Sequence, residues 1–383
     1  MRKRRPSVRA EGRRGATGRL SGRHLSGRHL SGESIKETIT VGMRDEILEQ
    51  PDVARRLLAD GRAEVDAIAR ALAGRAIDGV VIAARGTSDH AALYAKYLFG
   101  IRNRLPVAEA APSIVSAYGV VPVLERMLVI GISQSGASPD VAGFIAAARD
   151  AGAPTIAITN VPESALGRAA EHVVDLRAGD ERALAATKTY TAELLALGLL
   201  SVALGGLGGA ELDTVPHALE AVIAEEPGVE RLAHEKHELD RCIILGRGYQ
   251  YATAREWALK LKETALIQAE PYSAPDFEHG PRAIVRTGFP IIAIAPSGAV
   301  LPTVRSLVQR LRDEQGAEVM VVSDDPAVRA MGVAGLALPA GVPEWLSPIV
   351  AVVPGQFLAY HLTRAKGLDP EAPPHLQKVT LTR

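Results

Sequence analysis

Hydroxyl-bearing side chains gather at two places where a run of apolar residues ends. The segment 133–138 reads Ser-Gln-Ser-Gly-Ala-Ser, and the segment 85–88 reads Arg-Gly-Thr-Ser. Where a strand leads into a helix, free backbone N–H groups and the helix dipole favour an anion, which hydroxyls can also bind. Either segment alone could instead only cap its helix. Because ligands bind at the carboxyl ends of parallel strands, the two turns can converge, and we expect them to hold a phosphate.

A row of charged residues with the spacing of a helix face comes later in the chain. Glu256, Lys260 and Glu263 fall on one side of a helix. Such a face is usually a solvated row of ion pairs. The loop 276–281 that follows contains His279. Isomerising a sugar phosphate needs a carboxylate that moves a proton between adjacent carbons and a second group that opens the ring, and Glu263 and His279 can supply both.

A lysine stands near the end of the sequence, in the segment 373–383. An exposed lysine in such a place is ordinarily a solvated charge. If the segment folds back onto an anionic site, Lys378 can instead form an ion pair or a Schiff base with an open-chain sugar.

Apolar strand-like runs alternate with alanine-rich helical stretches from Met43 onward, which is typical of βα units around a parallel sheet. We therefore expect an α/β fold in which each hydroxyl-bearing turn follows a strand. The apolar stretch 194–204 is too short to span a membrane and is predicted to be a buried helix. The predicted strands are 79–83, 127–132 and 155–159 in the first half, and 243–245 and 290–294 in the second.

The spacing of the turns indicates an internal duplication. Arg85 precedes Ser135 by 50 positions, and Arg247 precedes Ser297 by the same number. Ser297 lies in a turn that lacks the hydroxyl cluster, so we expect only the first half to bind the phosphate. The boundary between the halves is expected in the stretch 205–228, which glycine and proline punctuate.

The net charge of zero is the sum of a basic N-terminal tail, residues 1–42, and a mildly acidic remainder, residues 43–383. Residues 1–42 carry 11 Lys and Arg against 3 Asp and Glu, while the remainder carries 33 against 41. The tail repeats Leu-Ser-Gly-Arg-His and has few large apolar groups, so we expect it to be disordered. The alternative is an arm that binds nucleic acid, but no helix-turn-helix or other nucleic-acid-binding module follows the tail in this sequence. Translation that begins at Met43 would remove the tail.

The single cysteine, Cys242, excludes a disulfide framework and a cysteine metal site within this sequence. A sequence with a single cysteine favours a reducing compartment. The opening segment also lacks the apolar core of a secretory signal peptide. We therefore expect a cytoplasmic protein with no membrane partner.

Five motifs occur together and in one order: the two hydroxyl-bearing turns, the Ala-Leu-Lys-Leu-Lys-Glu helix, the His-Gly-Pro loop and the Lys-Val-Thr tail. In this combination, residues 43–383 resemble the double sugar-isomerase (SIS) domain family, which includes the isomerase half of glucosamine-fructose-6-phosphate aminotransferase and stand-alone amino-sugar-phosphate deaminases. The resemblance implies two tandem three-layer α-β-α domains with parallel sheets, at 43–215 and 228–365. A tail, 366–383, would complete the active site.

The resemblance also implies a homodimer with its active sites at the subunit contact, and a role for each matching residue. Glu263 would be the enolisation base, His279 the ring-opening group, from the same or the neighbouring subunit, and Lys378 the lysine that contacts the open-chain sugar. Ala186 stands where the aminotransferase has a sugar-contacting serine, so this chain would lack that contact to the sugar. The residues that would bind the sugar phosphate are Ser88, Ser133, Gln134, Ser135 and Ser138, with Lys260 as a further site lysine.

Amino-sugar-phosphate deamination is the activity that we expect. A glutamine-dependent relative needs an N-terminal cysteine nucleophile in a separate domain, whereas this sequence has the tail and Cys242. Glucosamine 6-phosphate would become fructose 6-phosphate and ammonia, with no metal or redox cofactor. Alternatives are a galactosamine-6-phosphate deaminase, a fructosamine-6-phosphate deglycase, or a non-catalytic sugar-phosphate sensor, which can dispense with the base.

Overall fold

A computed structural model describes residues 42–378 of the 383-residue chain. The expected disorder of residues 1–42 falls almost wholly outside this range. A helix does begin at Met43, as the pattern there predicts. No helix within residues 42–378 is both long enough and apolar enough to cross a membrane.

Two five-stranded parallel sheets form the framework, and their strands follow the same order. The first sheet runs β2-β1-β3-β4-β5, and the second, read from its other end, runs β7-β6-β8-β9-β10. This identity of topology agrees with the internal duplication. The strands are β1 (Gly79–Ala83), β2 (Val107–Glu109), β3 (Met127–Ile132), β4 (Thr155–Thr159), β5 (His172–Asp175), β6 (Arg241–Gly246), β7 (Gln268–Ser273), β8 (Pro290–Ile294), β9 (Glu318–Ser323) and β10 (Ala334–Ala337).

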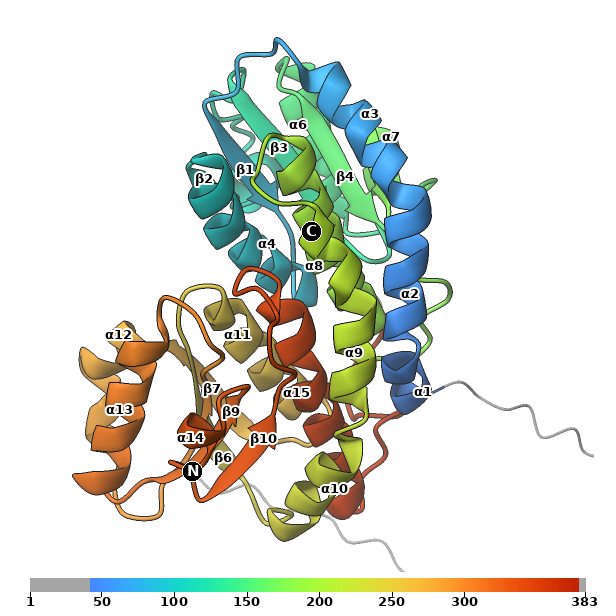
Figure 1. The fold of residues 1–383 in the computed structure, drawn as a ribbon. Helices are drawn as coiled ribbons and strands as arrows, with labels where there is room; N and C mark the ends of the chain where they lie inside the picture. The colour runs from blue at the N-terminus through green and yellow to red at the C-terminus, as the bar shows by residue number, and fades with distance from the viewer. Residues whose placement is uncertain (1–41, 379–383) are drawn as a thin grey trace, which may run out of the picture. The chain divides into compact units, whose positions relative to one another are not determined.

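Helices cover both faces of each sheet, which confirms the α/β fold. In Figure 1, α4 and α11 lie between the two sheets, and they contact each other. The α-helices are α1 (Met43–Leu48), α2 (Gln50–Arg56), α3 (Arg62–Leu72), α4 (Thr87–Leu98), α5 (Ser113–Ser116), α6 (Pro139–Asp150), α7 (Ala165–Ala169), α8 (Lys188–Ala203), α9 (Val215–Ile223), α10 (Glu226–Glu235), α11 (Gln250–Glu263), α12 (Ala274–Glu278), α13 (Leu301–Asp313), α14 (Pro326–Arg329) and α15 (Ser347–Ala365). Shorter turns of π-helix (Leu57–Gly61, Phe99–Asn103) and 3₁₀-helix (Ala210–Thr214, Pro281–Ile284) connect them.

The inner faces of the two sheets share one apolar core. Val80 and Ile82 of β1 belong to the same buried cluster as Ile244 of β6, whereas Val81 faces a separate outer cluster of the first half. This alternation follows from the pleat, which turns successive side chains to opposite faces. The second half has its own outer cluster, which includes Ile243.

The chain passes from one half to the other through helices. The predicted boundary stretch, 205–228, contains the 3₁₀ turn Ala210–Thr214 and the whole of α9, so it is not an open linker. The predicted buried helix is confirmed, since α8 is buried over most of its length. The domain bounds 43–215, 228–365 and 366–383 remain a prediction.

Candidate active site

A cavity of about 240 Å³ lies where the two halves meet, at the carboxyl ends of β1 and β3. Three parts of the chain that are far apart in sequence contribute to it: the two hydroxyl-bearing turns and a loop of the first half, α11 of the second half, and the C-terminal segment. The lining residues are Arg85, Gly86, Thr87, Ser88, Ser133, Gln134, Ser135, Ser138, Leu184, Ala186, Lys260, Glu263, Leu376, Gln377 and Lys378.

The turn after β3 is shaped by a glycine and by its own serines. Gly136 has φ 59°, and a Cβ there would lie 1.9 Å from Ser164 Oγ, so no side chain fits. The Gly136 N–H donates to Ser133 Oγ at 3.2 Å, and the Ala137 N–H donates to Ser135 Oγ at 3.3 Å. Each of these hydroxyls accepts one hydrogen bond from the turn and can still donate its own hydrogen. The turn is therefore already arranged to donate hydrogen bonds into the cavity.

Helix capping does not account for Ser138, the last hydroxyl of this turn. Ser138 stands at the N-cap of α6, but its side chain makes no capping hydrogen bond. The capping alternative is wrong for this residue. Its hydroxyl lines the cavity instead.

The turn after β1 is held by contacts with two helices, α6 and α8. The Arg85 guanidinium pairs with the buried Asp140 at 2.7 Å, which fixes this turn to α6. Gly86 has φ 56° and precedes α4. Ser88 Oγ lies 2.7 Å from a carboxyl oxygen of Glu193 on α8. Ser88 thus lines the cavity and is also engaged behind it.

Helix α11 is anchored by a tryptophan, and this anchoring aims its charged side toward the first half. The Trp257 indole N–H donates to the Ala351 carbonyl of α15 at 3.0 Å. At Gly355 a Cβ would lie 2.3 Å from the indole ring, so the two helices pack closely. The opposite side of α11 therefore faces α4.

The charged row of α11 is buried, so the alternative of a solvated ion-pair face is wrong for Glu256 and Lys260. Lys260 Nζ lies 2.6 Å from Glu263 Oε2 and 3.4 Å from Glu256 Oε1, and it donates to Thr87 Oγ1 at 3.2 Å. His90 Nδ1 lies 2.7 Å from Glu256 Oε2. Glu263 is partly open to the cavity, with 24% of its side chain exposed.

The buried pair stays charged because its members stabilise each other. Burial acts to raise the pKa of Glu256, but Lys260 and His90 outweigh it and hold the pKa below its usual range. Burial acts to lower the pKa of Lys260, but Glu256 and Glu263 raise it. The site therefore keeps an ammonium directly beside the Glu263 carboxylate.

The C-terminal segment folds back into the cavity. Lys378 Nζ donates to the Ala183 carbonyl at 2.5 Å and lies 3.3 Å from Glu181 Oε2. Glu181 is buried, and it also accepts hydrogen bonds from the Thr187 and Thr189 N–H groups. Lys378 is thus not an ordinary solvated charge but is held by a carboxylate that also shapes the loop around Ala186.

The structure brings together all the predicted site residues except His279. The eight that share the cavity are Ser88, Ser133, Gln134, Ser135, Ser138, Lys260, Glu263 and Lys378. His279 is exposed at the end of α12 and does not line the cavity of its own chain. Sequence reasoning missed Glu181, Glu193 and His90, because nothing in their local pattern marks them.

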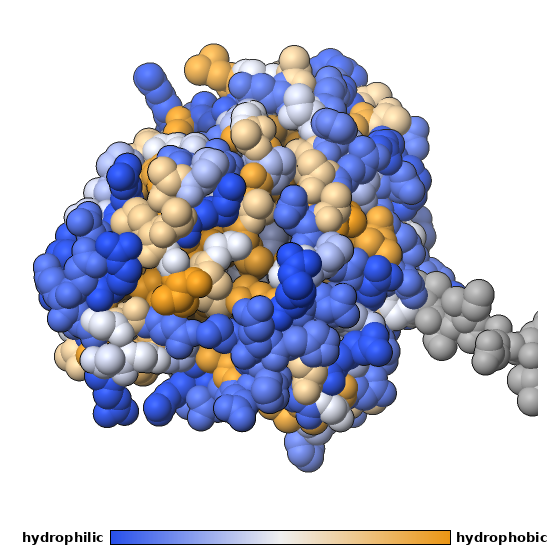
Figure 2. Space-filling view, turned by 60° about the horizontal axis from the view of Figure 1, so that its bottom comes forward, coloured by the Kyte–Doolittle hydropathy of each residue, from blue (hydrophilic) through white to orange (hydrophobic). Residues whose placement is uncertain are grey.

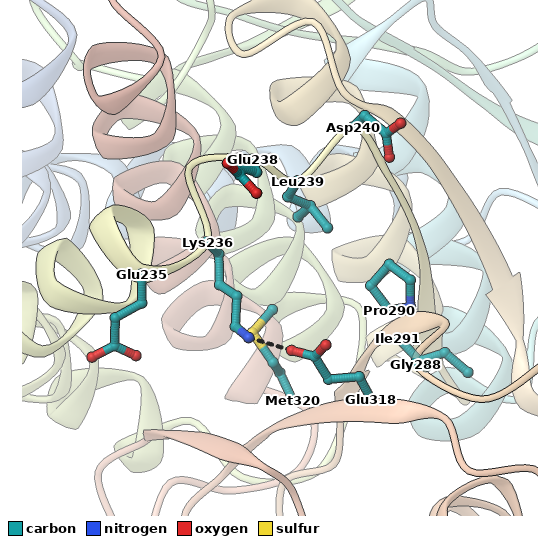
Figure 3. A pocket seen from close by; sticks show the side chains of 10 residues that line it. All are labelled: Glu235, Lys236, Glu238, Leu239, Asp240, Gly288, Pro290, Ile291, Glu318 and Met320. Carbon is teal, nitrogen blue, oxygen red and sulfur yellow. Dashed lines mark hydrogen bonds and ion pairs between the residues drawn. The ribbon is translucent and has the colours of Figure 1, made fainter.

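A second cavity, of about 290 Å³, lies at the amino ends of strands β8 and β9 in the second sheet. Figure 3 shows its lining, where Lys236 forms an ion pair with Glu318 at the start of β9. Pro290, at the start of β8, also lines it. Ligands of parallel sheets bind at the carboxyl ends of strands, so this cavity lies at the wrong end for the expected chemistry. Within residues 42–378, no group of three or more His, Cys, Asp or Glu is placed to hold a metal ion.

Comparison with known proteins agrees with this architecture. The family model described as SIS domain matches residues 77–203 and again residues 237–364. Glutamine–fructose-6-phosphate aminotransferase [isomerizing] of Methanothermobacter thermautotrophicus is 36% identical over 339 residues, which cover 88% of this chain and 56% of that protein. The chain thus spans just over half the length of this curated relative.

Two solved structures share the fold. A protein of Silicibacter pomeroyi, described provisionally as a phosphosugar isomerase, has a TM-score of 0.76 and 31% identity over 86% of this chain and 99% of its own. Glucosamine-6-phosphate deaminase of Thermotoga maritima has a TM-score of 0.66 and 23% identity over 86% of this chain and all of its own, a likeness that shows the fold alone. The protein belongs to the SIS domain family and carries two copies of the domain in tandem.

Proposed function

We propose that the protein is a sugar-isomerase-type enzyme that converts glucosamine 6-phosphate to fructose 6-phosphate and ammonia. The observation that carries the proposal is the composition of one cavity. Hydroxyl-rich turns of the first half, the Glu263 carboxylate of the second half and the Lys378 ammonium of the C-terminal segment all line it. A phosphate donor set, a base and a carbonyl-binding cation are the parts that this reaction needs.

The turns would hold the phosphate and so fix the distance from the anionic end of the sugar to Glu263. The hydroxyl oxygens of Ser133 and Ser135 accept hydrogen bonds from N–H groups of the turn. Their hydroxyl hydrogens would then be donated to the phosphate. Bound phosphate would then receive hydrogen bonds from side chains and from the junction with α6.

The proton transfer would fall to Glu263. In the open-chain amino aldose, Glu263 removes the proton from C2, and the electron pair of that bond forms the C1–C2 double bond while the C1 oxygen takes up a proton. Return of the proton to C1 leaves an imine at C2, and water releases ammonia from it to give the ketose phosphate. Lys260 Nζ lies 2.6 Å from Glu263 Oε2 and so holds this carboxylate in place beside the cavity.

The ring-opening step would need a group from outside this chain's own cavity. His279 is exposed and stands apart from the other residues, so we propose that it acts in the cavity of a second copy. The face shown in Figure 2 carries hydrophobic residues gathered among hydrophilic ones, a surface of the kind that subunit contacts cover. Sedimentation of the purified protein tests the dimer, and a monomer that retains full activity would contradict it.

Synthesis of the amino sugar is the second candidate, because the aminotransferase relative is 36% identical. The isomerase chemistry is shared, and only the nitrogen source differs. The one cysteine of this sequence, Cys242, is buried in β6, and burial raises the pKa of its thiol to about 12. This thiol is therefore unsuited to attack glutamine, so this second candidate would need a glutamine-cleaving group other than Cys242.

The test is to incubate the protein with glucosamine 6-phosphate, galactosamine 6-phosphate and a fructosamine 6-phosphate, following ammonia and ketose phosphate together. We expect equal amounts of the two products, and fastest turnover with glucosamine 6-phosphate. Product only from fructose 6-phosphate with glutamine would favour the synthase. Tight binding of one sugar without turnover of any would make the protein a sensor.

A further inference from the structure

A carboxyl group that the proposed reaction does not use lies directly behind the phosphate-binding turns. Glu193 of α8 is 1% exposed, and one of its oxygens is 2.7 Å from Ser88 Oγ. Its other oxygen, Oε2, is buried without a hydrogen-bond partner among residues 42–378. A buried carboxylate with only one partner would be costly, so its protonation state needs an explanation.

The surroundings of Glu193 favour the neutral form. Burial, and then the nearby carboxylates of Glu181 and Glu256, raise the pKa of Glu193 well above its usual range, against the opposing effect of the Ser88 hydrogen bond. Tyr190 is also buried close by, and no cation is among the groups that act on Glu193. A carboxyl group in this place therefore carries its proton and can donate a hydrogen bond.

The protonation state decides where the Ser88 hydrogen points. A hydroxyl has one hydrogen and two acceptor positions. If Glu193 were ionised, Ser88 would have to donate to it, and an oxygen lone pair would face the cavity. If Glu193 is neutral and donates, Ser88 accepts that bond and its hydrogen is free to point at the ligand.

We propose that neutral Glu193 is a positioning residue, which donates to the Ser88 hydroxyl and thereby directs the Ser88 hydrogen toward the phosphate of the substrate. The inference rests on the proposed function in one respect, because it takes an anion to be the occupant of the cavity. It adds a member to the site that touches no substrate and acts only through Ser88. It also explains why an acid is tolerated behind an anion site, since a neutral carboxyl does not repel the anion.

The test measures sulfate affinity by calorimetry, because sulfate is a dianion that does not titrate near neutral pH. Glu193→Gln keeps a neutral donor of the same length, and we expect its affinity to stay within about twofold of the unmodified protein. Glu193→Met keeps the length without a donor, and we expect about a tenfold loss of affinity. With substrate, Glu193→Met should raise KM by a similar factor and leave kcat nearly unchanged. Glu193→Leu serves as a second non-donor variant, and thermal unfolding shows which variants are folded.

A Ser88→Ala background separates positioning from a general structural effect. There the Gln and Met substitutions at Glu193 should have equal affinities, because the hydroxyl that Glu193 directs is gone. Equal loss in the Gln and Met variants, no loss in either non-donor variant, or a difference that persists without the Ser88 hydroxyl would overturn the inference. Failure of the unmodified protein to bind sulfate in competition with glucosamine 6-phosphate would instead count against the proposed anion site.

Discussion

The two repeats of the chain build the same turn and use it in different ways. In the first repeat, the turn after β3 lines the cavity with Ser133, Ser135 and Ser138. In the second repeat, the Ser297 N–H donates to Asp324 Oδ1 at 2.7 Å and the Ala299 N–H donates to Glu344 Oε2 at 3.0 Å. The second repeat thus satisfies backbone N–H groups of its turn with carboxylates of its own, whereas in the first repeat serine hydroxyls of the turn accept them. We therefore expect the turn of the first repeat, and not the turn that carboxylates occupy, to serve as the anion site.

The helices that follow β1 and β6 divide the remaining chemistry in the opposite way. When Arg85 is aligned with Arg247, the positions of Glu256, Lys260 and Glu263 on α11 correspond to Tyr94, Leu98 and Ile101 in the first repeat. The first repeat therefore has no acid or base at these positions. On the proposed function, one repeat would hold the phosphate donors and the other the base, so neither repeat alone could carry out the reaction.

Removing the base is expected to have the largest effect. Glu263→Gln should lower kcat about a thousandfold, because the amide cannot accept the C2 proton. Sugar-phosphate binding should change only a few-fold, as measured by calorimetry. Lys262, exposed on the same turn of α11, provides the matched control. Lys262→Gln should retain its activity, and a Glu263→Gln protein that turns over normally would mean that another group is the base.

Breaking the buried ion pair should cost stability as well as activity. Glu256→Gln should lower the free energy of unfolding by about 3 kcal/mol, since it leaves buried Lys260 with one carboxylate partner. The folded-state pKa of Glu256 lies below its unfolded value. Its ionised form therefore stabilises the fold above the unfolded pKa, and this contribution is lost as the pH falls. Urea denaturation should show the gap between the two proteins closing below about pH 4, and a gap that widens there would contradict this account.

Equivalent serines of the two repeats should respond differently. Ser135→Ala removes a hydroxyl from the cavity and should raise KM about tenfold. Ser297→Ala makes the same change in the second repeat, where the side chain is exposed and the turn is already occupied by carboxylates. It should leave KM unchanged. Similar effects of both substitutions on KM would remove the distinction between the turns.

The smallest expected effect concerns Glu344, whose carboxylate accepts a hydrogen bond from the turn after β8 in the second repeat. Glu344→Ala should lower the free energy of unfolding by about 1 kcal/mol, because the Ala299 N–H loses its acceptor. Turnover should be unaffected. Chemical denaturation and a steady-state assay check both parts, and a loss of activity without a loss of stability would show that this turn takes part in catalysis.

The inner strands could be predicted from sequence, and the outer strands could not. β1, β3 and β4 are continuous apolar runs and appear where they were expected. The missed strands β2, β5, β7 and β10 are the edge strands of the two sheets, and β7 reads Gln-Ala-Glu-Pro-Tyr-Ser. An edge strand is only partly covered, so it does not need an unbroken apolar run. Its sequence therefore resembles a loop.

The lining of the cavity was predictable, but the residues behind it were not. The serine turns, Glu263 and Lys378 stand in recognisable local patterns, and the structure places them together. Glu256 looks like part of a solvated helix face until α4 covers it. Glu193 lies in a run of apolar residues, and only tertiary packing brings it to Ser88. The role proposed for His279 would depend on a subunit contact, which no pattern within one chain contains.

A crystal structure of the protein with a bound amino-sugar phosphate tests the central claim most directly. The account predicts the phosphate at the turns of the first repeat, and a Glu263 oxygen within about 3.5 Å of both C1 and C2, the separation of a reactive complex. A sugar held at those turns with the Glu263 carboxylate directed away into solvent would contradict it.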